Sequence, residues 1–247
     1  MQASAIEFRL RMMISTAIIV LGFWSPWIEP LGLGQRRSVI AWLALNLARM
    51  GVASFATSTA IAIVLGALVA LLAAAMRIWG TAYLGSTTVN HAQMRSGKVM
   101  ASGPYRYVRN PLYLGSWLMA AAMGFAMPPT GALVTLVLLT LFLLRLILGE
   151  EAFLRKQLGE PYEVYCTSVP RLFPQLRSGL PSGGVQPQWG RAVLAELNPV
   201  SVFAALAFFS WSYDNWLIIR VILVGFGLSL VVRALLPREP DGITAAA

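Results

Sequence analysis

The sequence predicts an all-α, polytopic membrane helix bundle with about six transmembrane helices, roughly five to seven. Two observations carry this prediction. Of the 247 residues, 57% are hydrophobic and only 12% are charged, whereas a soluble domain usually has about 25% charged residues. The charges are also absent from long stretches and crowd into the gaps between them. Because these stretches are continuous rather than alternating, they favour helices over the short strands of a transmembrane barrel.

Six apolar runs have about the length of membrane helices, since a helix needs roughly 20 residues to cross the hydrocarbon core. The runs are Met12–Ile28, Thr57–Met76, Leu112–Met127, Ala132–Leu148, Pro199–Tyr213 and Trp216–Leu236. A short breaker at 128–131, with Pro128, Pro129 and Gly131, separates the third and fourth runs, so these two are predicted to form an antiparallel hairpin. The fifth and sixth runs are predicted to form a second hairpin that turns at Tyr213–Asn215.

The remaining segments divide the chain. Ser38–Phe55 is apolar but contains Asn46 and Arg49, so it is either a spanning helix with a polar face or an interfacial helix. Three glycines and two prolines make Ser178–Gln188 a predicted linker. The expected units are therefore an N-terminal membrane region (1–56), a membrane core (57–177), a linker (178–197) and a C-terminal hairpin with its tail (198–247).

The net charge of +9 indicates orientation rather than nucleic-acid binding, because no basic stripe is interleaved with aromatic residues. Basic residues lie at or after the ends of the second, fourth and sixth runs, which would all end on one side of the membrane. They are Arg95, Lys98, Arg106, Arg109, Arg155, Lys156, Arg171, Arg177, Arg191, Arg233 and Arg238. Cytoplasmic loops are enriched in such residues, so we assign this side to the cytoplasm and the protein to a cell inner membrane.

A first polar stretch on that side precedes the third run. Asn110-Pro111 has the form of a helix start, with asparagine as N-cap and proline at the first helical position. Free amides at such a start favour an anion, and Arg109 adds a cation beside it. The stretch therefore suits a carboxylate or a phosphate. The alternative is a simple cap, with arginines and tyrosines anchoring the membrane interface.

A second polar stretch follows the fourth run and begins with Glu150 and Glu151. Both are expected at the C-terminal end of a membrane helix, where the dipole disfavours negative charge, so a functional use is plausible. A carboxylate can accept hydrogen bonds from two vicinal hydroxyls, as on a ribose. Because successive helical residues diverge by about 100°, one glutamate should face the site and the other a structural partner such as Arg145. The alternative is that both are solvated.

The ordered series of these motifs resembles the isoprenylcysteine carboxyl methyltransferase family and the related phospholipid methyltransferases. The resemblance covers about residues 75–177, with Arg77, Trp79 and Leu84-Gly85 as its lead-in. The motifs are Gly103-Pro104-Tyr105, Arg109-Asn110-Pro111-Leu112-Tyr113-Leu114-Gly115, Glu150-Glu151-Ala152-Phe153-Leu154, Leu158-Gly159-Glu160-Pro161-Tyr162-Glu163-Val164-Tyr165 and Arg171-Leu172-Phe173-Pro174.

The resemblance implies a membrane enzyme that transfers a methyl group from S-adenosyl-L-methionine to a lipid-like or prenylated acceptor in the bilayer. It implies that Tyr105, Arg109, Tyr113 and Gly115 line the methionine end of this cofactor and that Glu150 and Glu151 hold its ribose. Tyr162, Tyr165 and Arg171 would close the pocket, and Arg109, Asn110 and Tyr113 would be the catalytic residues. No metal site is expected. Methyl transfer at a sulfonium chiefly needs alignment and exclusion of water.

Several alternatives stay open. The family has histidine where this chain has Asn110, which can donate hydrogen bonds but cannot move a proton, so an inactive homologue is one hypothesis. His91 is the only histidine and is expected to be solvated. Tyr165-Cys166 and Val169-Pro170-Arg171 also resemble the end of the NADPH-dependent sterol reductases. An isoprenylcysteine carboxylate is the favoured acceptor and a phospholipid amine the alternative, while the oligomeric state is not predicted.

Overall fold

The computed structural model describes residues 3–34, 36–84, 101–212 and 215–235. These residues form ten α-helices and one short 3-10 helix, with no β-strand beyond an isolated bridge between Ala101 and Ser182. The elements are α1 (Ala5–Arg9), α2 (Arg11–Trp24), α3 (Val39–Arg49), α4 (Phe55–Leu84), η1 (Gly103–Arg106), α6 (Pro111–Gly124), α7 (Pro129–Leu158), α8 (Glu160–Ser168), α9 (Trp189–Ala195), α10 (Leu197–Ser212) and α11 (Asn215–Leu235). The predicted all-α fold is confirmed.

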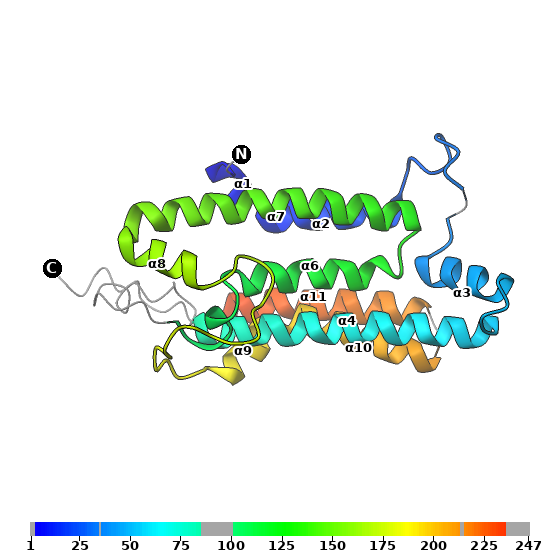
Figure 1. Cartoon of the computed structure of the whole chain (residues 1–247). Helices are drawn as coiled ribbons and strands as arrows, with labels where there is room; N and C mark the ends of the chain where they lie inside the picture. The colour runs from blue at the N-terminus through cyan, green and yellow to red at the C-terminus, as the bar shows by residue number, and fades with distance from the viewer. Residues whose placement is uncertain (1–2, 35, 85–100, 213–214, 236–247) are drawn as a thin grey trace.

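Each of the six apolar runs is a helix, and the long helices lie nearly side by side along one axis (Figure 1). The predicted hairpin of the third and fourth runs is confirmed, because α6 packs against α7 across a tight turn that ends at Pro128, the N-cap of α7. The second predicted hairpin is present as the packed pair α10 and α11. Its turn at 213–214 lies outside the described residues.

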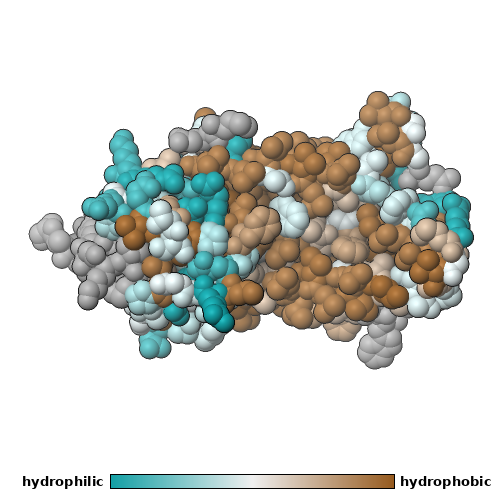
Figure 2. All heavy atoms as spheres, in the orientation of Figure 1, coloured by the Kyte–Doolittle hydropathy of each residue, from teal (hydrophilic) through white to brown (hydrophobic). Residues whose placement is uncertain are grey.

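The surface of the bundle suits a bilayer. Figure 2 shows a broad hydrophobic belt around the middle of the visible face, with hydrophilic side chains gathered over the end formed by α8 and the loop after it. Large apolar side chains of α4 and α7, such as Leu68 and Leu141, are exposed, as expected where lipid replaces water. By length and composition, two helices among the described residues can cross a membrane, namely Phe55–Tyr83 and Pro129–Leu158.

A third span is possible if the bent pair α9 and α10 counts as one crossing. The helices Arg11–Trp24, Val39–Arg49 and Arg220–Val232 are apolar but shorter. The described residues thus support a polytopic bundle, while the expected total of about six spans stays a prediction.

The ambiguous segment at 38–55 contains a short helix and not a long one. α3 begins after Ser38, whose hydroxyl accepts a hydrogen bond from the amide of Ala41 at 3.2 Å, and it ends at Arg49. Its 11 residues rise roughly 16 Å, about half of the hydrocarbon thickness. α3 lies at the end of the bundle opposite α8 (Figure 1). Its length therefore favours the interfacial alternative.

The fourth run corrects one expectation. Glu150 and Glu151 were expected at a helix C-terminus, but α7 continues to Leu158 and ends at Gly159, which has a φ of 62°. The two glutamates therefore lie two turns inside the helix, where the dipole argument does not apply. Basic side chains from other segments contact Glu151, so this charge has partners inside the bundle and does not mark a helix end. The second run likewise continues past Arg77 to Leu84.

Candidate active site

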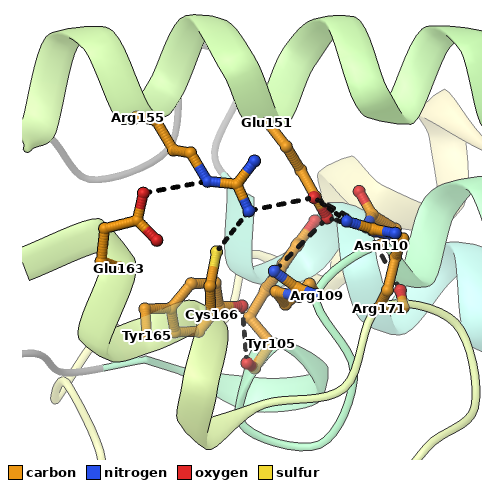
Figure 3. Close-up of polar contacts among 9 residues, drawn as sticks. All are labelled: Tyr105, Arg109, Asn110, Glu151, Arg155, Glu163, Tyr165, Cys166 and Arg171. Carbon is orange, nitrogen blue, oxygen red and sulfur yellow. Dashed lines mark hydrogen bonds and ion pairs between the residues drawn. The ribbon is translucent and has the colours of Figure 1, made fainter. Parts of the chain in front are cut away.

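Four of the predicted site residues meet at the hydrophilic end of the bundle (Figure 3). Arg109 and Asn110 come from the loop that leads into α6, Glu151 from α7, and Arg171 from the loop after α8. A backbone hydrogen bond of 2.9 Å from the amide of Arg109 to the carbonyl of Pro170 joins two of these loops. Motifs that are separate in the sequence therefore form a single cluster in the structure.

Glu151 is the centre of this cluster, and its side chain is only 2% exposed. Arg171 donates to both of its carboxylate oxygens, with distances of 2.8 to 3.1 Å. Asn110 Nδ2 donates to Oε1 at 3.3 Å, and Arg109 lies 3.6 Å from the same oxygen. The hydrogen bonds between Arg171 and Glu151 raise the pKa of the Arg171 guanidinium. A buried carboxylate requires such partners, because desolvation of an unpaired charge is costly.

Arg109 has donors that the rest of the described chain leaves unused. Its side chain is 10% exposed, and its Nε and Nη1 atoms are buried without a hydrogen-bond partner among the described residues. The ion pair with Glu151 does not meet hydrogen-bond geometry. A buried guanidinium with free donors is costly unless it meets an anion. Arg109 is therefore a candidate anion-binding residue, as its position before α6 predicted.

Three predicted tyrosines form the wall beside the cluster. Tyr162 and Tyr165 are buried on α8 and lie 5.9 Å apart between ring centroids. Tyr165 donates from its hydroxyl to the carbonyl of Tyr105 at 2.9 Å, which holds η1 against α8. Burial raises the pKa of the phenols of Tyr105 and Tyr165 above the ordinary value. Both phenols are therefore neutral hydrogen-bond donors at neutral pH.

Glu150 has a different partner from Glu151, as the helical spacing predicted. Its carboxylate accepts a hydrogen bond of 2.8 Å from the hydroxyl of Tyr113 on α6. Arg145, which we expected as a partner for one of the glutamates, instead pairs with Glu7 of α1 at 3.0 Å. Tyr113 and Glu150 thus form a second polar contact between α6 and α7, separate from the cluster around Glu151.

Gly115 lies at the closest approach of α6 to α4. A Cβ atom at this position would lie 2.5 Å from Cγ of Arg77 and 3.2 Å from the carbonyl of Ala73. Packing against α4 therefore explains why glycine is needed here. Its expected place beside a cofactor stays a prediction, as do the binding and catalytic roles of the other residues.

The position of Asn110 was predicted correctly, but the use of its side chain was not. Asn110 is the N-cap residue and Pro111 the first residue of α6, yet the asparagine makes no side-chain capping hydrogen bond. Its amide instead donates to Glu151 and, at 3.2 Å, to the carbonyl of Arg171. The amide binds the buried carboxylate of Glu151 and not the start of α6, because hydrogen bonds to charged groups are stronger than neutral ones.

Arg155 is a residue of the cluster that the motifs did not single out. Its guanidinium lies 3.9 Å from Glu151 and 3.1 Å from Glu163, and it donates to the sulfur of Cys166 at 3.9 Å. The spacing of Glu151 and Arg155, four residues apart on one helix, was the available signal. His91, Arg95 and Lys98 lie outside the described residues.

This arrangement defines a class: a helical membrane protein with a buried, arginine-rich cluster at one end of the bundle. Comparison with known proteins is consistent with it. Residues 61–161 match the model of the phospholipid methyltransferase family. The resemblance predicted from the motifs is therefore confirmed over the core from α4 to the start of α8, and the match indicates a membrane methyltransferase. No curated protein and no solved structure matches the chain.

Proposed function

We propose that this protein transfers a methyl group from S-adenosyl-L-methionine to a lipid-like acceptor in the bilayer. The observation that carries the proposal is the meeting of Arg109, Asn110, Glu151 and Arg171 at one end of a core that matches a methyltransferase family. α8 and the loop that carries Arg171 follow the matched segment closely. The proposed site therefore lies at the junction of the matched core and the loop that closes it.

The residues present fit this cofactor in charge. Arg109 has buried donors without a partner among the described residues, which suits the carboxylate of an amino acid. Glu151 is a carboxylate that would accept hydrogen bonds from the two ribose hydroxyls in exchange for part of its hydrogen bonds from Arg171, which would stay beside it as a counterion. The neutral phenols of Tyr105 and Tyr165 complete a wall that excludes water. When bound, S-adenosyl-L-methionine supplies a methyl group on a positively charged sulfur.

The roles of the side chains follow from this fit. Arg109 would fix the amino-acid end and Glu151 the nucleoside end, so that the two charged residues orient the methyl group. Alignment of this kind supplies a large part of a rate enhancement. Tyr113, whose hydroxyl donates to Glu150, would line the methionine end of the cofactor. Asn110 would position Glu151 without moving a proton.

A carboxylate of the isoprenylcysteine type is the acceptor that these side chains favour. It is already ionised at neutral pH and needs no general base, whereas an ammonium must first lose a proton. Asn110 replaces the residue that could have taken such a proton. The arginines also give this end of the bundle a positive field, which attracts an anionic headgroup.

A phospholipid amine is the second candidate acceptor, and the family match favours it, because the matching family is described as phospholipid methyltransferases. Glu150 is the carboxylate outside the arginine cluster that could accept the proton. Assays of the detergent-purified protein with a labelled methyl donor would compare a farnesylcysteine analogue with phosphatidylethanolamine. Labelling of the first acceptor alone supports the carboxylate, and labelling of the second alone supports the amine.

Cofactor binding is tested first, by calorimetry with S-adenosyl-L-methionine on wild-type protein, Glu151→Gln and Arg109→Ala. We expect saturable binding by the wild type and at least a tenfold higher Kd for each variant, because a hydrogen bond to a charged group contributes about 1.5–3 kcal/mol. Glu163→Gln is the matched control, since Glu163 shares Arg155 with Glu151 but is more than half exposed. It should bind as the wild type does.

Thermal unfolding of each variant separates loss of the site from loss of the fold. No binding by folded wild-type protein, in detergent and in lipid nanodiscs, would contradict the proposal. NADPH would then be the next ligand, as the resemblance to the reductases suggests.

A further inference from the structure

A second buried ion pair lies in the bundle, away from the cluster around Glu151. Arg77 of α4 donates from Nε and Nη2 to the two carboxylate oxygens of Glu196, at 2.6 and 3.0 Å. The side chain of Glu196 is 4% exposed and that of Arg77 is 16% exposed. Thr81 donates its hydroxyl to Glu196 at 2.8 Å. Both carboxylate oxygens are thus satisfied, as a buried carboxylate requires.

Glu196 occupies the break between α9 and α10, where the two helices bend by 70°. Its amide donates to the carbonyl of Ala192, which closes the last turn of α9. The residue belongs to the C-terminal part of the chain, which lies beyond the matched segment 61–161. The ion pair therefore joins this part to the core at a bend and not along a helix face.

Arg77 also contacts α6. Its Nη1 donates to the hydroxyl of Ser116 at 2.6 Å and approaches the carbonyl of Leu112 at 3.4 Å. Ser116 in turn donates to the same carbonyl at 2.9 Å. The missing side chain of Gly115 lets Arg77 lie directly against the helix. One guanidinium thus connects Glu196 with the start of α6.

That start of α6 carries proposed site residues. Asn110 is its N-cap and Tyr113 stands in its first turn. The carbonyl of Leu112 lies between them and is held by both Arg77 and Ser116. A shift of Arg77 would therefore move the backbone on which Asn110 and Tyr113 depend, and displacements near 1 Å are enough to reduce catalysis strongly.

We propose that Glu196 is a positioning residue that fixes the first turn of α6 through Arg77. The C-terminal α9–α11 would then complete the site rather than only the bundle. As regards catalysis this inference rests on the proposed function, while the positioning of α6 can be tested without it.

The experiment compares Glu196→Gln and Glu196→Asp with the wild type by hydrogen exchange and by calorimetry. For Glu196→Gln, we expect faster exchange in the peptide 109–117 and a five- to tenfold higher Kd for S-adenosyl-L-methionine. Glu196→Asp keeps the charge and should give smaller effects on both. Peptides from the second half of α7 should exchange at the wild-type rate in both variants.

Glu7→Gln is the matched control, because Glu7 also binds an arginine through two hydrogen bonds, and this arginine, Arg145, lies on α7 and not on α4. It should leave the peptide 109–117 and the Kd unchanged. Faster exchange confined to α9 and α10, with an unchanged peptide 109–117, would overturn the proposal. If the wild type does not bind S-adenosyl-L-methionine, the proposed function fails and the exchange data still decide whether Glu196 positions α6.

Discussion

At the residue scale, Asn110 shows how one side chain serves both the backbone and a buried charge. It stands where a helix cap was predicted, but its amide donates to Glu151 and to the carbonyl of Arg171. Three segments far apart in the sequence therefore depend on one amide group. A donor is needed at this position, and an acceptor would face the carboxylate of Glu151 directly.

Asn110→Asp tests this requirement. The new carboxylate would lie against Glu151 and lose both hydrogen bonds, so we expect the protein to be destabilised by about 1–3 kcal/mol. Thermal unfolding in detergent at neutral pH measures the effect. Asn110→His, which restores the residue of the resembled family and keeps a donor, should be close to the wild type. Equal stability of the aspartate variant would show that the amide contributes nothing.

The candidate site was predictable in part at this scale. The ordered motifs identified Arg109, Asn110, Glu151 and Arg171, and the structure brings these residues together. The partners of Glu150 and Arg145 were not predictable, because they depend on which helices lie side by side. Arg145 contacts Glu7, a residue more than a hundred positions earlier, and local spacing carries no information on such a contact.

At the element scale, α2 and α7 cross where two glycines face each other. A Cβ atom on Gly131 would clash with the carbonyl of Gly22 and with Ser25 Oγ. A Cβ atom on Gly22 would in turn clash with the hydroxyl of Thr135. Small residues at such a crossing allow two membrane helices to approach closely, and van der Waals packing is the main attraction between helices in lipid.

Gly131→Ala should therefore separate the two helices. We expect a loss of about 1–3 kcal/mol in stability from overpacking, measured by thermal unfolding in detergent. Gly124→Ala is the control, since its Cβ would meet only the Cβ of Ala132 at an ordinary 3.5 Å. Alanine favours helices over glycine, so this control should be neutral or slightly stabilising. A neutral Gly131→Ala would contradict the close crossing.

Most elements were predictable from apolar runs, because lipid imposes one simple rule on helix length and composition. The ends of α4 and α7 were not. Both helices continue past charged residues, Arg77 and Glu150–Glu151, that looked like boundaries. Glu196 neutralises Arg77 and Arg171 neutralises Glu151, while the Glu150 carboxylate accepts a hydrogen bond from Tyr113. A charge marks the end of an apolar run only where water is its partner.

At the scale of the whole molecule, the two ends of the bundle differ. On the visible face, more hydrophilic side chains lie over the end with α8 and the following loop than over the opposite end, which carries α3 (Figures 1 and 2). The basic residues Arg106, Arg155, Arg171 and Arg177 belong to the first end. The rule that positive loops stay inside predicts that this end faces the cytoplasm.

Cysteine labelling tests the orientation in a Cys166→Ser background. Leu176→Cys lies on the α8 side and is 98% exposed, while Leu33→Cys lies in the loop between α2 and α3 and is 49% exposed. In intact spheroplasts, a membrane-impermeant maleimide should label the cysteine at position 33 and spare the one at position 176. After permeabilisation both should react. The reverse pattern in intact cells would invert the topology.

The place of Arg171 has a practical consequence for anyone who divides this chain. The match to the family ends at 161, ten residues before the arginine that neutralises Glu151. A recombinant fragment cut at the edge of the matched segment would keep the recognisable signature and leave a buried anion without its main counterion. Such a fragment should misfold or aggregate on expression, so boundaries for truncation are better drawn from the contacts of Glu151 and Glu196 than from sequence similarity.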